Sequence, residues 1–172
     1  MRWMWIDRVV ELVPRERLVA IKNVSLAEEH LHDHFAARPG RAAIPIMPAS
    51  LIIEGMAQTA GILVGHAEGF REKVILAKVG LAELDREATP GTTLRYTATV
   101  RQLDRQGAST QGVVELLDHA RSELGWQRIG AIDLMFSHID QNMAGLEFPA
   151  ENFVFGESFK TLLRTSGVEI PA

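Results

Sequence analysis

Residues 45–64 read PIMPASLIIEGMAQTAGILV, and this stretch determines how the chain folds. Pro48 suits the first turn of a helix, because proline lacks the amide hydrogen that this turn leaves unbonded. Beyond Pro48, apolar side chains occupy almost every face of the predicted helix. A helix that is apolar all round is buried rather than laid on a surface. The stretch therefore predicts a helix at the centre of the protein.

Strand-like stretches lie on both sides of this helix in the sequence. Residues 2–13 and 16–24 read as two strands joined by a turn at Pro14. After the helix, turn signals separate four further strands, which we place at residues 73–84, 92–103, 108–118 and 126–138. This order predicts an α+β fold in which one antiparallel sheet of about six strands wraps around the buried helix.

The length of 172 residues fits a single domain, which we place at residues 1–140. Residues 141–172 form a C-terminal extension that we expect to pack on this domain. Its aromatic residues include Phe148, Phe153 and Phe155. Phe159, Leu162 and Leu163 then follow with the spacing of one face of a short helix.

Composition excludes several classes of protein. The chain has no cysteine, which rules out disulfides, thiolate metal sites and cysteine nucleophiles. Its net charge of −4 and the absence of a basic run argue against nucleic-acid binding. The most apolar stretch, residues 51–64, is shorter than the ~20 residues of a membrane span, and the early charges do not suit a signal peptide. We therefore expect a soluble, cytoplasmic protein without a membrane segment.

Glu54 is an unusual residue, because it falls in the second turn of the buried helix. An ionised, unpaired carboxylate in a core would be very costly. Glu54 must therefore be neutral, paired, or directed into a polar cavity. A purely structural carboxylate, bonded to backbone or to an arginine, would meet the same condition.

His34 closes a run of alternating histidines, His30, His32 and His34. Such a run could share one face of a strand and bind a metal, but no further His or Cys lies nearby, so we expect no metal. Together with Glu54, His34 indicates acid–base catalysis rather than metal binding. A histidine base and a carboxylic acid are the groups needed to eliminate water from a β-hydroxy carbonyl compound. Free amides at the start of the helix after Pro48 would stabilise the enolate-like charge.

Residues 33–61 carry a long motif around this pair. The matching pieces are His34-Phe35, Pro45-Ile46-Met47-Pro48, Leu51-Ile52-Ile53-Glu54 and Met56-Ala57-Gln58. Together they resemble the signature HFPGxPIMPGVLIIEAMAQ of the 3-hydroxyacyl-(acyl-carrier-protein) dehydratases of the FabZ/FabA type. Glu54 stands where the FabA branch carries Asp, so the chain is more similar to the FabZ branch.

This resemblance implies a hotdog fold and a hydro-lyase that converts a (3R)-3-hydroxyacyl thioester into a trans-2-enoyl thioester in fatty-acid or related lipid biosynthesis. It implies that His34 abstracts the α-proton and that Glu54 orients or protonates the leaving hydroxyl. It further implies a homodimer whose sites combine His34 of one chain with Glu54 of the other, often within a trimer of dimers. Acyl carrier protein delivers the substrate, and no cofactor is expected. The residues expected to bind substrate and oxyanion are Phe35, Met47, Pro48, Ala49, Ser50 and Gln58.

The chain departs from the signature at two points near the site. Ala36-Ala37 replaces the usual Pro-Gly, and the interval from His34 to Pro45 is six residues longer than in the signature. Ala49 replaces the usual glycine; alanine keeps the amide donor but adds a methyl group. The longer interval carries Arg38 and Arg41, which we expect to contact an acidic carrier protein.

Two other functions remain open at this point. In a hotdog thioesterase, Glu54 would activate water against the thioester, but the motif around His34 and Pro45 would then have no explanation. In a catalytically silent acyl-binding subunit, the longer interval and Ala49 would mark the loss of activity.

Overall fold

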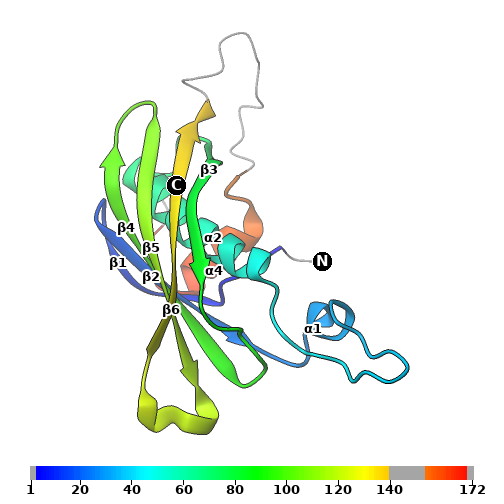
Figure 1. Cartoon of the computed structure of the whole chain (residues 1–172). Helices are drawn as coiled ribbons and strands as arrows, with labels where there is room; N and C mark the ends of the chain where they lie inside the picture. The colour runs from blue at the N-terminus through cyan, green and yellow to red at the C-terminus, as the bar shows by residue number, and fades with distance from the viewer. Residues whose placement is uncertain (1–2, 140–153, 170–172) are drawn as a thin grey trace.

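The computed structural model describes residues 3–139 and 154–169 (Figure 1). The elements of the described chain are β1 (Arg8–Val13), β2 (Arg17–Val24), α1 (Glu29–Asp33), α2 (Ala49–Ala67), β3 (Val74–Leu84), β4 (Thr92–Leu103), β5 (Gly107–Asp118), the 3₁₀ helix η1 (His119–Leu124), β6 (Gln127–His138) and α4 (Glu157–Thr165). The predicted order of two strands, one long helix and four strands is confirmed.

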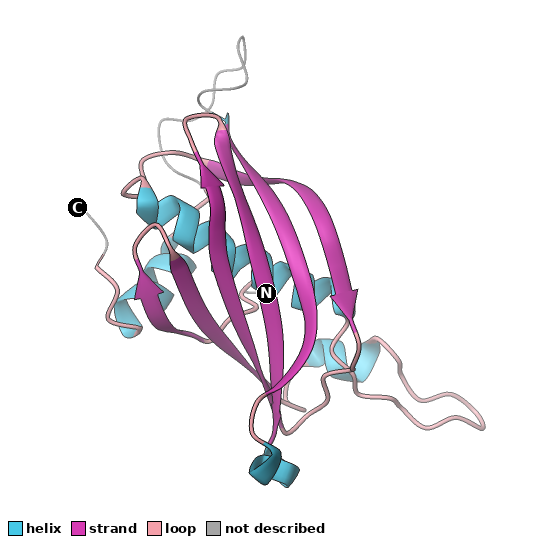
Figure 2. Cartoon of the chain, turned by 60° about the vertical axis from the view of Figure 1, so that its left-hand side comes forward, coloured by secondary structure: helices cyan, strands magenta, loops and turns pink. Residues whose placement is uncertain are grey.

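All six strands belong to one antiparallel sheet with the order β1-β2-β4-β5-β6-β3. The sheet curls around α2, which lies along its concave face (Figure 2). Helix α2 contacts β2, β3, β4, β5 and β6. Strands β1 and β3 form the two edges of the sheet, and β2 and β3, the strands before and after α2 in the sequence, are separated by β4, β5 and β6.

Helix α2 forms the centre of the core, as its apolar composition predicts. Ile52, Met56, Ala60 and Leu63 are fully or almost fully buried against apolar side chains of the sheet. Among the described residues, no helix is both long and apolar enough to cross a membrane.

The first strand is shorter than expected, because it begins at Arg8 rather than at residue 2. The chain before it leaves the sheet and runs toward α2, where the backbone N–H of Trp5 donates to Gln58 Oε1 at 2.8 Å. The backbone carbonyl of Trp3 accepts from Gln58 Nε2 at 3.0 Å. A side chain of the central helix thus takes the backbone bonds that a neighbouring strand would have supplied.

Helix α1 includes the first two histidines, although the Ser25-x-x-Glu28 pattern of a capping box predicts a helical turn that ends before them. The Glu28 side chain accepts from the Ser25 N–H at 3.1 Å, as in a capping box, but the helix begins only at Glu29. The Ser25 hydroxyl accepts from the Ala27 N–H at 3.2 Å, which holds this stretch as a turn. His30 and His32 therefore lie within the helix, and His34 is its C-cap residue.

Residues 154–169 pack against the core formed by the sheet and α2. Leu162 and Leu163 of α4 are buried in the same apolar cluster as α2, and Phe155 joins them. The Ser166 hydroxyl accepts from the backbone N–H of Val9 on β1 at 3.0 Å. The first part of the expected extension, including Phe148 and Phe153, lies outside the described residues.

Gly55 on α2 allows the closest approach between the helix and the sheet. A Cβ atom at Gly55 would lie 2.6 Å from the ring of Tyr96, which is fully buried, and 2.9 Å from the Trp5 carbonyl oxygen. Gly61, two turns later, has open space, with its nearest neighbour at 3.7 Å. The two glycines therefore provide a matched pair for measuring the packing of α2.

We predict that Gly55→Ala lowers the free energy of unfolding by about 1–2 kcal/mol, because overpacking outweighs the gain in helix propensity. Gly61→Ala should raise it by up to about 1 kcal/mol, because only the propensity term applies. Urea unfolding followed by tryptophan fluorescence measures both. Equal stability of the two variants would contradict the close packing of Gly55 on Tyr96.

Candidate active site

His34 opens onto a pocket of about 430 Å³ between α1, the start of α2 and the end of β3. We call it the His34 pocket. Five of the residues expected at the site meet here, His34, Phe35, Met47, Pro48 and Ala49. The other lining residues are Ile46, Ile52 and the stretch Leu84–Glu87. The charged residues of that stretch, Asp85, Arg86 and Glu87, carry no signal in the sequence that connects them to the site.

The imidazole of His34 is exposed and accessible. Its backbone N–H donates to the His30 carbonyl at 3.1 Å, which fixes its position at the end of α1. Its ring lies edge-on to Phe35, with the ring centres 4.4 Å apart. His34 thus presents its side chain to a ligand or to another protein chain.

The residues between His34 and Pro45, a stretch that is longer than in the family signature, form a hairpin. Arg38 and Arg41 exchange backbone hydrogen bonds of 3.0 and 2.9 Å, and Gly40 at the turn has the positive φ of +76° that favours glycine. At the base of the hairpin, the Ile44 N–H donates to the Phe35 carbonyl at 3.0 Å. The added residues project outward, so the chain returns to the pocket directly after them (Figure 1).

Free amide groups face this region at the start of α2. Pro48 is the N-cap residue and has no side chain that accepts from the helix. In the part of the chain that the structure describes, the N–H groups of Ala49 and Ser50 have no hydrogen-bond partner. They are therefore available to a bound anion or carbonyl oxygen. Ala49 lines the His34 pocket, whereas Ser50 is exposed and lines neither pocket described here.

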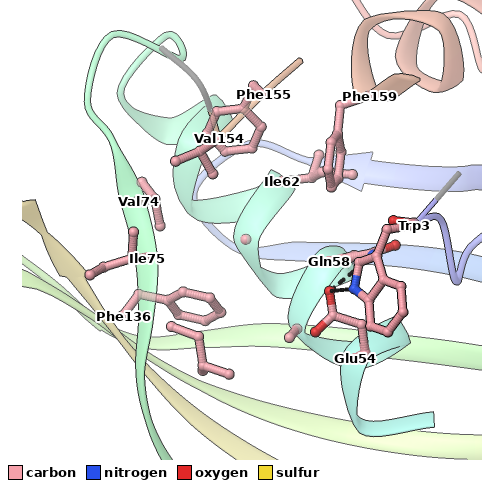
Figure 3. A pocket seen from close by; sticks show the side chains of 13 residues that line it. Trp3, Glu54, Gln58, Ile62, Val74, Ile75, Phe136, Val154, Phe155 and Phe159 are labelled. Atoms are coloured by element: carbon pink, nitrogen blue, oxygen red, sulfur yellow. Dashed lines mark hydrogen bonds between the residues drawn. The ribbon is translucent and has the colours of Figure 1, made fainter. Parts of the chain in front are cut away.

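Glu54 lines a second pocket, of about 370 Å³, that we call the Glu54 pocket. It lies between α2, the start of β3, Phe136 of β6 and residues 154–159 (Figure 3). Glu54 is half-buried, and its Oε1 accepts from Gln58 Nε2 at 3.0 Å and from the indole Nε1 of Trp3 at 3.2 Å. The carboxylate is therefore both paired and directed toward a cavity, as its place in the helix required.

Gln58 holds Glu54 in this position. Its amide group is buried and makes bonds to Trp5 N, Trp3 O and Glu54 Oε1, so both of its N–H groups are engaged. Oε2 of Glu54 makes no hydrogen bond within the described residues and is the oxygen left for a ligand. These contacts favour a positioning role for Gln58 over direct substrate binding. Trp3 is a site residue that the sequence did not indicate.

His34 and Glu54 do not meet within one chain, because they line different pockets. Strand β3 connects the two pockets. Val74, Ile75 and Leu76 at its start line the Glu54 pocket, and Leu84 at its end lines the His34 pocket. Each pocket thus carries half of the expected catalytic pair.

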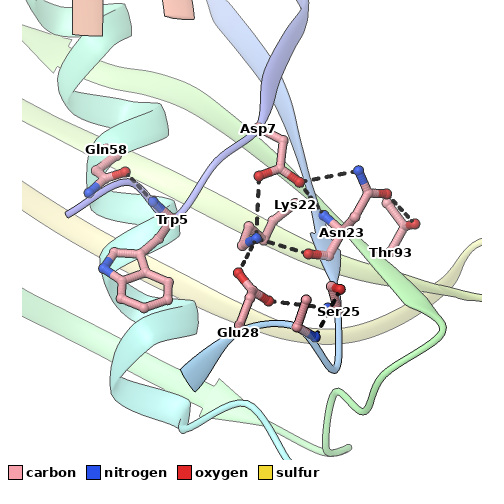
Figure 4. A network of polar contacts seen from close by, with 9 residues as sticks. Trp5, Asp7, Lys22, Asn23, Ser25, Glu28, Gln58 and Thr93 are labelled. Carbon is pink, nitrogen blue, oxygen red and sulfur yellow. Dashed lines mark hydrogen bonds and ion pairs between the residues drawn. The ribbon is translucent and has the colours of Figure 1, made fainter. Parts of the chain in front are cut away.

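A buried lysine anchors the chain that leads into α1 (Figure 4). Lys22 on β2 is only 5% exposed. Its Nζ lies 2.7 Å from Glu28 Oε1 and 3.3 Å from Asp7 Oδ1, and it donates to the Asn23 carbonyl at 2.9 Å. Asp7 Oδ2 also accepts from the Asn23 N–H at 2.7 Å. The network joins the N-terminal segment, β2 and the residue that precedes α1, and so fixes the helix that ends at His34.

His30, His32 and His34 lie in or at the end of a helix and have different surroundings. The hypothesis that they share one face of a strand is therefore wrong. His30 lies edge-on to Trp5 at 5.0 Å between ring centres, and burial lowers the pKa of its imidazole. The His32 ring nitrogen Nε2 lies 2.6 Å from the Leu26 carbonyl. Within residues 3–139 and 154–169, no group of three or more His, Cys, Asp or Glu side chains is arranged to hold a metal ion.

The fold defines the class of protein. Among solved structures, the dehydratase heterocomplex ApeI:P from Xenorhabdus doucetiae is similar, with a TM-score of 0.58 and 17% identity over 79% of this chain and 83% of that one. An acyl-CoA hydrolase variant from Staphylococcus aureus has a TM-score of 0.56 and 13% identity over 89% of this chain and 88% of that one. Zebra fish thioesterase superfamily member 2 has a TM-score of 0.52 and 14% identity over 76% and 79% of the two chains. These likenesses confirm the hotdog fold.

Sequence similarity then identifies the family. The model of the FabA-like domain matches residues 2–117, and the chain belongs to that family. The 3-hydroxyacyl-(acyl-carrier-protein) dehydratase FabZ of Alkalilimnicola ehrlichii is 38% identical over 104 residues, which cover 58% of this chain and 63% of that protein. FabZ of Acidiphilium cryptum is 44% identical over 96 residues, or 54% of each. The chain thus spans between about half and two thirds of the length of these relatives.

The Lys22 network leads to a stability prediction. Lys22→Met should lower the free energy of unfolding by about 3 kcal/mol, because it leaves partly buried carboxylates without their cation. Lys160→Met removes an exposed ion pair with Glu157 on α4 and should leave stability unchanged. Urea unfolding of the two variants makes the comparison, and equal effects would contradict an anchoring role for Lys22.

Proposed function

We propose that the protein is a (3R)-3-hydroxyacyl-(acyl-carrier-protein) dehydratase that forms a trans-2-enoyl thioester. One observation carries the proposal. The proposed base and acid of the motif occupy separate pockets at opposite ends of an edge strand, and each pocket lacks what the other contains. This division is what a site shared between two copies of the chain requires.

Strand β3 supplies the contact between the copies. Its residues Leu76–Glu83 are exposed, including Leu76, Val79 and Leu81. An exposed edge strand offers free backbone donors and acceptors to another strand. Two copies of β3 pairing antiparallel about a two-fold axis near Val79, the middle residue, would set the start of one strand beside the end of the other. The Glu54 pocket of one chain would then meet the His34 pocket of its partner.

The proposed mechanism uses the groups of both pockets. The His34 imidazole takes the α-proton of the bound thioester. The enolate-like charge on the thioester oxygen is stabilised by the free amides at the start of α2 and by the helix dipole. Glu54 from the other chain then protonates the β-hydroxyl, the C–O bond breaks, and water leaves. Gln58 and Trp3 hold Oε1, so the transferred proton lies on Oε2.

The proposal also includes binding of an acyl carrier protein and a larger assembly of dimers. Arg38 and Arg41 are exposed on the hairpin beside the His34 pocket, where they would contact an acidic carrier protein. As the family resemblance implies, we expect the dimers to associate further as a trimer of dimers. The expected compartment is the cytoplasm, since a chain without cysteine suits a reducing environment.

The catalytic pair is tested by the reverse reaction, hydration of a crotonyl thioester, followed by loss of absorbance of the conjugated double bond. His34→Ala should lower kcat by about 10²–10⁴, the usual contribution of positioned acid–base catalysis. Glu54→Gln should lose most activity while keeping the fold, because an amide of similar shape can still bond with Gln58. Near-normal turnover of either variant would remove that residue from the mechanism.

Mixing the two inactive variants tests whether the site is shared. A mixed dimer has one site with both substitutions and one site with His34 and Glu54 intact, so random mixing should restore roughly a quarter of the wild-type activity. Sites contained within one chain would give no restoration. In the same assay, release of free thiol would indicate a thioesterase. An inactive wild type that still binds the thioester would indicate a silent acyl-binding subunit.

The dimer contact is tested at the centre of β3. Val79 is 41% exposed on this edge, and Val10 is 50% exposed on β1 at the opposite edge of the sheet. Val79→Lys should produce a monomer with little activity, because two lysines would face each other near the two-fold axis. Val10→Lys should stay dimeric and active. Sedimentation velocity reports the assembly state, and a dimeric Val79→Lys protein would exclude this edge as the interface.

A further inference from the structure

The Glu54 pocket has one polar end and one apolar end (Figure 3). Glu54, Gln58 and the Trp3 indole lie together at the first turns of the helix. Farther along α2 the lining is aliphatic and aromatic, with Ile62 on the helix and Val74 on the facing strand. A pocket with a carboxyl group at one end and only hydrocarbon at the other suits a molecule with a reactive head and an apolar tail.

Residues 154–159 close the apolar end. Val154, Phe155 and Phe159 all line the pocket, and all three lie beyond residues 2–117, which match the FabA-like domain. The wall at this end therefore comes from a part of the chain that the family match does not include.

The wall is firmly seated on α2. A Cβ atom at Gly65 would lie 2.4 Å from the ring of Phe155, so the ring packs directly on the helix backbone. Phe155 also lies edge-on to Phe70 at 4.9 Å and to Phe159 at 5.9 Å between ring centres. Burial of Leu162 and Leu163 then anchors the helix that carries Phe159. Phe155 is thus part of the core, whereas Phe159 is half-buried and borders the open space.

We propose that residues 154–159 form the end wall of the acyl-chain pocket and exclude long acyl chains. This inference rests on the proposed function, because it takes Glu54 as the group that meets the β-carbon. The volume of about 370 Å³ lies near the lower end of the range for small-molecule pockets, roughly 300–1,000 Å³. Phe155 packs beside Gly65, eleven residues after Glu54, which corresponds to about 16 Å of helix. An extended acyl chain advances by about 1.3 Å per carbon, and the ring and the terminal methyl group occupy part of that length, so a chain with its β-carbon at Glu54 fills the space at about twelve carbons. A longer chain has to displace Phe159 or leave its tail in water.

The test measures kcat/KM for hydration of crotonyl-, dodecenoyl- and hexadecenoyl-pantetheine, each expressed relative to crotonyl. In the wild type, the hexadecenoyl ratio should be the lowest. Phe159→Ala removes the ring at the open side of the wall and should raise that ratio by about tenfold or more, the scale on which hydrophobic pockets discriminate by chain size. Thr161→Ala is the matched control, because it truncates an exposed residue of the same helix that does not line the pocket and should leave the ratio unchanged.

A second variant fills the pocket from the opposite side. Gly61 lines it with open space for a side chain, and leucine is a good helix former. Gly61→Leu should lower the dodecenoyl ratio by about tenfold. Unchanged ratios in both Phe159→Ala and Gly61→Leu would overturn the proposal, even if the enzyme is active.

Binding affinities measured by calorimetry test the role of the end wall independently of dehydratase activity. If the wild type hydrates none of the thioesters, the dehydratase proposal fails, and the affinities decide the role of the wall. Dodecenoyl-pantetheine should then bind more tightly than hexadecenoyl-pantetheine, and Phe159→Ala should shift the balance toward hexadecenoyl by about tenfold. Tighter wild-type binding of the longer chain, or no binding of any thioester, would overturn the inference.

Discussion

The structure depends on the burial of α2 on all sides, although that helix carries a carboxylate. The sheet covers only part of the helix surface. The segment before β1 covers another part by bonding to Gln58, and the aromatic residues after β6 cover the far end. Glycine at positions 55 and 65 allows Tyr96 and Phe155 to pack directly on the helix backbone. Residues 3–5 and Phe155 are thus held in place by the central helix.

The same constraint produces the site. A carboxylate within a buried helix needs hydrogen-bond donors and access to a cavity, because an isolated buried charge is very costly. Gln58 and Trp3 supply the donors on one oxygen, and the Glu54 pocket provides space beside the other. A carboxylate that would destabilise an ordinary core is therefore accommodated here beside a pocket, where we propose that it acts as the acid.

The separation of the two pockets follows from the topology of the sheet. Strand β3 is an edge, and the two pockets lie at its two ends. Helix α1 is held to the core by the buried Leu31 and to β2 by the Lys22 network, whereas His34 at its end is exposed. An exposed His34, an exposed edge strand and a half-buried Glu54 are the three features on which the proposal of a shared site rests.

The sequence by itself determined the order of the six strands and the place of α2 among them. Alternating and helical patterns, together with turn residues, are local signals, so the start of α2 and the strands from β2 to β6 could be predicted to within a residue. The motif also indicated the proposed base, the proposed acid and the helix start that lines the His34 pocket. The tertiary structure alone decided the late start of β1, because Gln58 bonds to the backbone of residues more than fifty positions away. It alone revealed Trp3 as a partner of Glu54, the separation of His34 from Glu54, and the closure of the pocket by residues 154–159. The physical reason is that these features depend on contacts between segments distant in the sequence, whose register and orientation no local pattern specifies.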